Sequence, residues 1–124
     1  MADKIECPVD KSLSLFSKKW SIQIIRDLFF GKKHFKEFKE DKNITNKVLS
    51  NCLKELESNN LISKKVISTT PNITEYSLTE RGKALNKVIY ELAMFTLEDQ
   101  NNNYNNETND YLIETFKEKL EIKD

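Results

Sequence analysis

The chain has 124 residues, of which 38% are hydrophobic and 32% are charged, and its formal net charge is zero. A chain of this length has the size of one domain with one modest core. It shows no signal-peptide pattern and no run of about 18 apolar residues that could cross a membrane. We therefore expect a cytoplasmic protein without membrane contact.

The zero net charge hides an uneven distribution along the chain. From Lys32 to Ile67, nine lysines stand against five acidic residues, whereas from Glu98 to Asp124 eight acidic residues stand against three lysines. A basic middle suits a protein that approaches phosphate with one surface only. Solvated helix faces would produce the same sums, so the charges alone do not decide between the two.

The N-terminal part predicts two helices. Beyond Pro8, apolar residues up to Phe16 follow the spacing of one helical face. The segment from Trp20 to Phe29 carries a longer apolar stripe typical of a core helix. Gly31 is well placed to end this helix.

Two further helices are predicted in the basic middle. Phe35 and Phe38 lie three residues apart and predict a short helix that exposes its lysines. After a break, Thr45 is a good N-cap for an amphipathic helix. The apolar side of this second helix is predicted to carry Val48, Leu49, Cys52, Leu53 and Leu56.

The pattern then changes to one typical of strands. The runs LISKKVIS and TEYSLT are rich in β-branched and aromatic residues, and the Ser68–Asn72 segment between them has turn composition. These runs predict a β-hairpin.

The C-terminal part predicts two helices. Thr79 caps one long helix over residues 80–100, and an Asn-rich linker follows. Tyr111–Ile122 is predicted to form a terminal helix.

This order of elements predicts an α+β, mostly α, fold: a winged helix-turn-helix with a two-stranded β wing. We expect a single winged-helix DNA-binding domain over residues 1–124. Residues 34–79 form the helix-turn-helix and wing, while residues 1–18 and 80–124 supply flanking N- and C-terminal dimerisation helices. In such folds the second helix of the pair enters the major groove and the wing lies against the DNA backbone.

Candidate DNA contacts follow from this arrangement. Asn side chains pair with adenine edges, Lys with guanine or phosphate, and surface lysines attract the backbone through counterion release. The alternatives are a solvated helix face and a wing that contacts nothing. The predicted DNA-binding residues are Lys33, His34, Lys36, Thr45, Asn46, Lys47, Ser50, Asn51, Lys54, Ser68, Thr69, Thr70 and Asn72.

A lone winged helix reads only a few base pairs, so the predicted partners are a pseudo-palindromic double-stranded operator and a second copy of the chain. Apolar stripes at both ends of the chain have no obvious place in a small core, and exposed stripes favour a homodimer. The predicted dimer interface comprises Leu13, Phe16, Leu112, Ile113, Phe116 and Leu120.

The two cysteines are interpreted separately. Cys7, with Lys4 and Lys11 nearby to favour the thiolate, is a candidate redox sensor; the alternative is a small residue packed at the dimer interface. Cys52 lies on the core stripe and is interpreted as packing. The chain has no zinc-type spacing, so neither a metal nor a cofactor is expected.

Several spaced motifs resemble the HxlR family of bacterial winged-helix regulators. The likeness covers about residues 7–97 and implies a homodimeric repressor or activator, in some members with an electrophile- or oxidant-sensing cysteine at the position of Cys7. The wing departs from the family, because Pro71–Ile73 stand where members often carry Lys or Arg, and the tail beyond Asn101 is not distinctive. The matching residues are Cys7-Pro8, Lys19-Trp20, Gly31-Lys32, Phe35, Glu75, Tyr76, Leu78, Thr79 and Gly82.

The sequence as a whole predicts a sequence-specific DNA-binding transcriptional regulator, not an enzyme. Two alternatives remain: a winged-helix protein-interaction module without specific DNA binding, and an enzyme with Cys7 as nucleophile. The enzyme would need a pocket and an orienting partner for Cys7 and His34, and nothing in the sequence suggests either. The sequence does not specify which promoter is bound, whether the effect is repression or activation, or which effector is sensed.

Overall fold

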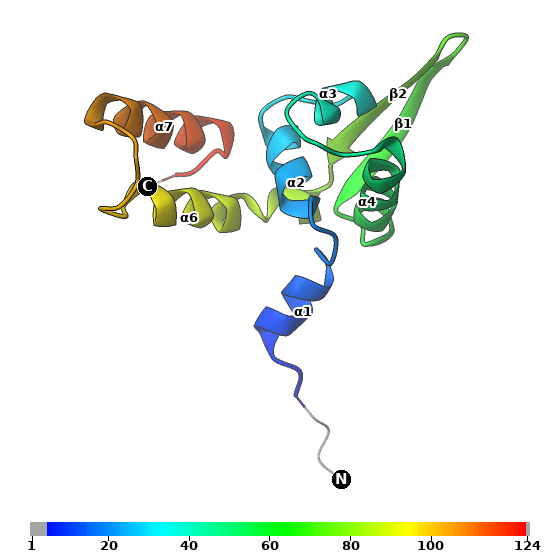
Figure 1. Cartoon of the computed structure of the whole chain (residues 1–124). Helices are drawn as coiled ribbons and strands as arrows, with labels where there is room; N and C mark the ends of the chain where they lie inside the picture. Colours follow the sequence, from blue (N-terminus) through cyan, green and yellow to red (C-terminus); the bar gives the residue numbers. More distant parts are fainter. Residues whose placement is uncertain (1–4, 124) are drawn as a thin grey trace.

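The computed structural model describes residues 5–123, so residues 1–4 and 124 of the predicted domain lie outside the described residues. A two-stranded wing projects from one end, the last two long helices lie at the other, and α2 lies between them (Figure 1). Within residues 5–123, no helix is long and apolar enough to span a bilayer. The elements are α1 (Pro8–Ser14), α2 (Ser21–Phe29), α3 (Phe35–Lys39), α4 (Asn46–Ser58), β1 (Ile62–Thr69), β2 (Asn72–Leu78), α5 (Glu80–Lys83), α6 (Asn86–Leu97) and α7 (Asn106–Lys119).

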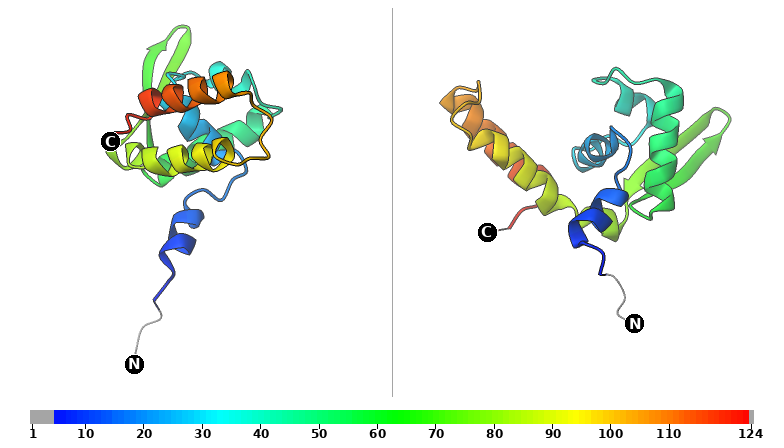
Figure 2. Two further views of the ribbon diagram at one scale, coloured as in Figure 1. Left: turned by 90° about the vertical axis from the view of Figure 1, so that its left-hand side faces the viewer. Right: turned by 60° about the horizontal axis from the view of Figure 1, so that its bottom comes forward.

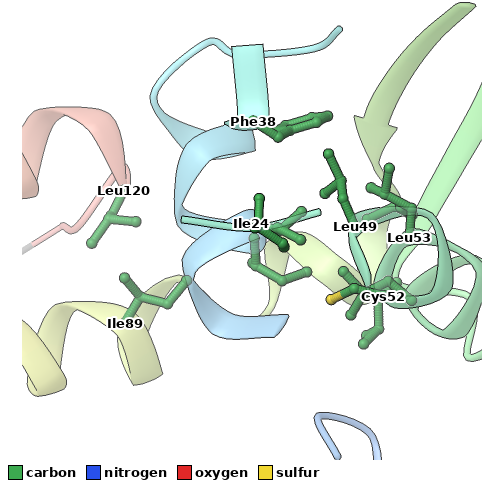
Figure 3. Close-up of a cluster of buried hydrophobic side chains, with 12 residues drawn as sticks. Ile24, Phe38, Leu49, Cys52, Leu53, Ile89 and Leu120 are labelled. Carbon is green, nitrogen blue, oxygen red and sulfur yellow. The ribbon is translucent and has the colours of Figure 1, made fainter. Parts of the chain in front are cut away.

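Helix α2 runs through the centre of the hydrophobic core. Its Ile24 and Ile25 are completely buried. In Figure 3, side chains from α3 and α4 lie on one side of Ile24, and side chains from the C-terminal helices lie on the other. The labelled residues around it are Phe38, Leu49, Cys52, Leu53, Ile89 and Leu120. Helix α2 therefore joins the helix-turn-helix to the C-terminal helices.

Helix α2 ends at the glycine that the sequence indicates. Gly31 has a φ of +98°, a left-handed conformation that favours glycine. Its N–H donates to the carbonyl of Leu28 at 3.2 Å, and the N–H of Lys32 donates to the carbonyl of Asp27 at 3.0 Å. The turn thereby satisfies two carbonyls at the end of the helix.

The predicted β-hairpin is present as the wing. Strands β1 and β2 pair antiparallel, from Ile62 opposite Leu78 to Thr69 opposite Asn72, with an irregularity in the register after Val66. Ile62 is buried at the base, whereas the residues toward the tip are mostly exposed. Only the base of the wing is therefore anchored in the core.

The prediction of one long helix after Thr79 is wrong, because the chain forms α5 and α6 with a break between them. Thr79 caps only the short α5, by accepting the N–H of Gly82 at 3.0 Å. A Cβ on Gly82 would lie 2.1 Å from the carbonyl oxygen of Leu61, so this turn is pressed against the start of the wing. That close contact fixes α5 in a direction that α6 does not continue.

Helices α6 and α7 form a helical pair that stands away from the wing (Figure 2). The linker between them is held by Asn102, whose side-chain N–H groups donate to the carbonyls of Thr96, Leu97 and Asp99. Asn105 then caps α7 by accepting the N–H of Thr108 at 2.7 Å. The Asn-rich linker and the terminal helix are confirmed, although α7 begins earlier than the predicted Tyr111.

Candidate nucleic-acid interface

Helix α4 presents one polar face to solvent. Thr45 caps it as predicted, its Oγ1 accepting the N–H of Val48 at 3.1 Å. Asn46, Lys47, Asn51 and Lys54 are exposed and Ser50 is half-buried, while the opposite side of the helix packs into the core. The exposed groups are amides and ammonium groups, which can contact base edges and phosphates.

Val48 departs from the predicted apolar side of α4. Its side chain is 45% exposed, whereas Leu49, Cys52, Leu53 and Leu56 are buried. Val48 lies at the edge of the stripe in the first turn, where no neighbouring element covers it. A branched apolar group is thus present on the surface that carries Lys47 and Asn51.

A buried ion pair fixes the turn that leads into α4. The side chain of Lys42 is 2% exposed and that of Asp27 is 4% exposed, and the two are in direct contact. The Lys42 ammonium also donates to the carbonyl of Phe38 at 2.8 Å and pairs with Asp41 at 3.0 Å. Lys42 belongs to the basic middle of the chain, yet it points inward and cannot reach phosphate.

The same ammonium group changes the titration of Asp41. The hydrogen bond from Lys42 lowers the pKa of Asp41 to about 2, with a smaller contribution from Lys32. Lys39 ties the end of α3 to α4 by donating to Oδ1 of Asn46. Lys39 thus joins the two helices of the helix-turn-helix directly, while the ion pairs of Lys42 hold the turn between them.

Lys33 and His34 connect the start of α3 to the wing. Nδ1 of His34 lies 3.1 Å from the carbonyl oxygen of Thr74, to which it donates, and the N–H of Tyr76 donates to the carbonyl of Lys33 at 2.8 Å. The Lys33 ammonium lies 3.6 Å from a carboxylate oxygen of Glu75. These predicted DNA-binding residues therefore also position the wing.

Glu37 holds the segment before α3 from the other side. Its carboxylate accepts the N–H of His34 at 2.9 Å and that of Lys33 at 3.1 Å. These backbone hydrogen bonds lower the pKa of Glu37. Lys36, on the same short helix, is exposed, so its ammonium group remains accessible at this surface.

The tip of the wing is uncharged. Thr69, Thr70 and Asn72 are exposed, and the hydroxyl of the half-buried Ser68 accepts the N–H of Thr70 at 3.3 Å. Positive charge occurs instead along β1, at the exposed Lys64 and Lys65. The sequence prediction counted these two lysines in the basic middle of the chain but did not include them among the DNA-binding residues. Their position on a strand of the predicted hairpin could have indicated that they face DNA with the wing.

The predicted dimer interface is only partly exposed. Leu13 is 60% exposed, but Leu120 is completely buried inside the chain, so its placement at a subunit interface was wrong. Phe116 stacks edge-on against Phe30, with ring centroids 5.1 Å apart. Leu112 and Phe116 line a hollow against α6, and Ile113 is half-buried. The stripe of α7 packs largely within its own chain because α6 and α2 lie beside it.

Exposed apolar side chains gather instead on α1 and α6. A groove of about 460 Å³ between these helices is lined on the α1 side by Pro8, Val9, Leu13 and Phe16. On the other side it is lined by Ile22, Leu85, Val88 and Leu92. Phe95, further along α6, is 78% exposed. Val9, Val88, Leu92 and Phe95 were not among the predicted interface residues, although the helical spacing of the last three was visible in the sequence.

The two cysteines differ in their access to solvent. Cys7 is exposed at the start of α1, whereas Cys52 is buried. Burial raises the pKa of the Cys52 thiol, whose sulfur lies 3.7 Å from the hydroxyl oxygen of Ser21. Cys52 is therefore a packing residue, as predicted. Lys4, the predicted neighbour of Cys7, lies outside the described residues. Within residues 5–123, no cluster of three His, Cys, Asp or Glu side chains could hold a metal ion.

An exposed polar helix preceded by a short helix and followed by an anchored β-hairpin defines the winged helix-turn-helix class of DNA-binding proteins. The profile of the HxlR-like helix-turn-helix family matches residues 15–104. The chain belongs to this family, whose members are transcriptional regulators. Cys7 lies before the matched range.

Sequence relatives support the assignment. The chain is 41% identical over 88 residues to the HTH-type transcriptional regulator YodB of Bacillus subtilis, covering 69% of this chain and 79% of YodB. It is 37% identical over 94 residues to the uncharacterized HTH-type transcriptional regulator YvaP of the same organism, covering 74% and 87% of the two chains.

Solved structures give the same fold. The redox regulator HypR in its oxidized form superposes with a TM-score of 0.70 at 30% identity, covering 77% of this chain and 99% of HypR. The reduced form of YodB from B. subtilis superposes with a TM-score of 0.64 at 36% identity, covering 78% and 97%. The predicted winged helix-turn-helix and the predicted family are thus confirmed.

Proposed function

We propose that this chain acts in the cytoplasm as a homodimeric regulator that binds a pseudo-palindromic DNA operator through α4. The exposed polar face of α4 carries this proposal, because its amide and ammonium groups lie on a rigid helix opposite a well-packed core. Asn51 is suited to pair with a base edge, and Lys47 and Lys54 to contact guanine or phosphate. The hydroxyl of Thr45 accepts the capping hydrogen bond and is the weaker candidate for a base contact.

The surroundings of α4 would supply contacts that do not depend on sequence. Lys36 on α3 and Lys64 and Lys65 on β1 are exposed cations that can release counterions from the DNA backbone. The neutral tip of the wing can only donate hydrogen bonds, from Thr69, Thr70 or Asn72. We therefore expect the lysines of β1 to contribute more to affinity than the tip does.

The apolar surface of α1 and α6 supports a homodimer. The side chains of Val9, Leu13, Val88, Leu92 and Phe95 are between 46% and 78% exposed. Contiguous apolar surface of this kind marks an interaction site, and a two-fold axis buries it against itself. Two copies would then present two α4 helices to successive half-sites.

Cys7 is proposed as the sensor of an oxidant or electrophile. It is exposed and directly precedes Pro8 and Val9, which line the α1–α6 groove. Two similar proteins support this proposal: HypR is a redox regulator, and one structure of YodB is of the diamide-treated protein. A modified Cys7 would change the size and charge of a side chain at the edge of the proposed dimer interface.

The test is fluorescence-anisotropy titration of DNA from the region upstream of the gene, with scrambled DNA as the control, at several salt concentrations. We expect sequence-preferring binding that weakens with salt. Lys47→Gln should reduce the salt slope by about one, whereas the matched variant Lys87→Gln on α6 should not. Asn51→Ala should lower the preference for the specific sequence by about 1–3 kcal/mol.

The same titration separates the alternatives. A response to diamide that is absent in Cys7→Ser would support the sensor. An unchanged salt slope in Lys47→Gln would contradict the proposed orientation of α4. Failure to bind any DNA in a salt-dependent manner would instead favour a protein-interaction module.

A further inference from the structure

A second cavity, distinct from the α1–α6 groove, lies between α2 and the C-terminal helices. Its volume is about 460 Å³, within the range of about 300–1,000 Å³ found for small-molecule sites. One wall is apolar and is formed by α6, α7 and one residue of α2. The residues of this wall are Ile22, Ile89, Leu92, Ala93 and Phe116.

The opposite wall is polar and cationic. It is lined by Lys19, in the turn before α2, and by Gln23 and Arg26, which lie three residues apart on one side of α2. The Lys19 ammonium lies 5.0 Å from the centre of the Trp20 ring. A contact of this kind leaves the charge of the ammonium group in place.

Arg26 retains hydrogen-bonding capacity toward the cavity. Its Nε and Nη2 donate to Oδ1 of Asp27 at 3.3 and 2.9 Å. A guanidinium group carries five N–H donors in a planar fork, so the donors of Nη1 remain after these two bonds. Nη2 also lies 3.6 Å from Oδ2 of Asp41. Asp27 pairs in addition with Lys42, and Asp41 with Lys42 and Lys32, so three cations share these two acids. Lys19 adds a further positive charge to the lining of the cavity.

We propose that this cavity binds a small organic anion that has an apolar body and one carboxylate. The apolar body would lie against Ala93 and Phe116, and the carboxylate would accept hydrogen bonds from Lys19, Gln23 and Arg26. A neutral ligand of the same shape would not pair with the Lys19 ammonium or accept a charge-assisted hydrogen bond from Nη1 of Arg26, and would bind more weakly.

The position of the cavity gives the ligand a way to affect DNA binding, a consequence that rests on the proposed function. The ligand would contact α2 of the helix-turn-helix and also α6, and the cavity shares Ile22 and Leu92 with the α1–α6 groove. Occupancy would therefore favour one orientation of the helix-turn-helix relative to the proposed dimer helices. Because that orientation sets the separation of the two α4 helices, ligand and operator binding would be coupled.

The test is direct titration of the full chain with 2-naphthoate, with 2-naphthalenemethanol as the neutral ligand of similar shape, by isothermal calorimetry without DNA. We expect saturable binding of the carboxylate and weaker binding of the alcohol. Lys19→Gln should weaken naphthoate binding about five-fold, while the matched variant Lys18→Gln should leave it unchanged. Ala93→Leu should weaken binding by placing a larger side chain where the apolar body of the ligand would lie.

The variants also show which outcomes overturn the proposal. Thermal unfolding of each variant establishes that it is folded, and Lys19 lies on the exposed rim, so its replacement does not depend on the core. Absence of saturable naphthoate binding, equal affinity for acid and alcohol, or an unchanged naphthoate affinity in a folded Ala93→Leu variant would each refute the site. Because these measurements contain no DNA, they are independent of whether the operator hypothesis holds.

Discussion

Replacing Lys42 with methionine should strongly destabilise the protein, although most lysines lie on the surface, where substitutions change stability little. The Lys42 side chain is 2% exposed, and its ammonium contacts Asp27, Asp41 and the carbonyl of Phe38. Methionine would fill a similar volume but would leave the buried Asp27 with Arg26 as its remaining partner. Removing one member of a buried ion pair costs about 3–5 kcal/mol of stability. Because Asp27 keeps its contact with Arg26, we expect a loss at the lower end of this range, about 3 kcal/mol.

Urea unfolding followed by far-ultraviolet circular dichroism measures this loss. All variants are compared at one protein concentration, because dimerisation would make the stability concentration-dependent. We expect the urea midpoint to fall with little change in the slope. Lys36→Met, on the exposed side of α3, is the matched control and should change the stability by no more than about 0.5 kcal/mol.

The double variant Asp27→Asn/Lys42→Met decides whether the buried charge is the cause. Removing both charges leaves no unpaired ion, so the double variant should recover more than half of the stability lost in Lys42→Met. A loss below about 1 kcal/mol in the single variant, or no recovery in the double variant, would refute the reasoning.

Three further predictions concern packing, acid and assembly. Gly82→Ala should destabilise the protein by at least about 2 kcal/mol, because the new Cβ would lie 2.1 Å from the backbone oxygen of Leu61; thermal unfolding measures this. Asp41 should stabilise the fold fully above its ordinary pKa of 3.8 and lose that effect as the pH falls toward its folded pKa of about 2. Because the Asp41 side chain is 53% exposed, the effect should stay below about 1 kcal/mol, measured as the difference from Asp41→Asn in urea midpoints across this range. Leu92→Lys should shift the protein toward monomer in analytical ultracentrifugation.

Each of these three predictions has a result that would contradict it. An unchanged melting temperature in Gly82→Ala would show that α5 can move away from the wing. If the difference in urea midpoint between the native protein and Asp41→Asn persists unchanged at the lowest pH, the contribution of Asp41 to stability does not come from its ion pair with Lys42. A native chain that is already monomeric at all concentrations, or a Leu92→Lys variant as dimeric as the native chain, would remove the α1–α6 surface from the proposed interface.

Features governed by neighbouring residues could be predicted from the sequence. Gly31 ends α2 because its φ of +98° suits glycine, and Thr45 begins α4 because its hydroxyl caps the first turn. The wing follows from β-branched strands around a turn segment. Chain order then indicates a winged helix-turn-helix, and the polar residues of α4 could be selected from helical periodicity alone.

Features that depend on which surfaces meet were decided only by the tertiary structure. Periodicity shows that Leu120 shares a stripe with Phe116, but only the packing of α7 on α6 and α2 shows that the stripe is covered within the chain. The composition of the basic middle does not distinguish the buried Lys42 from the exposed Lys47. Periodicity also does not show the break before α6, which follows the close packing of Gly82 against Leu61, a residue far from it in sequence. Local sequence thus determines the elements and their faces, whereas burial and charge pairing depend on long-range contacts that bring distant residues together.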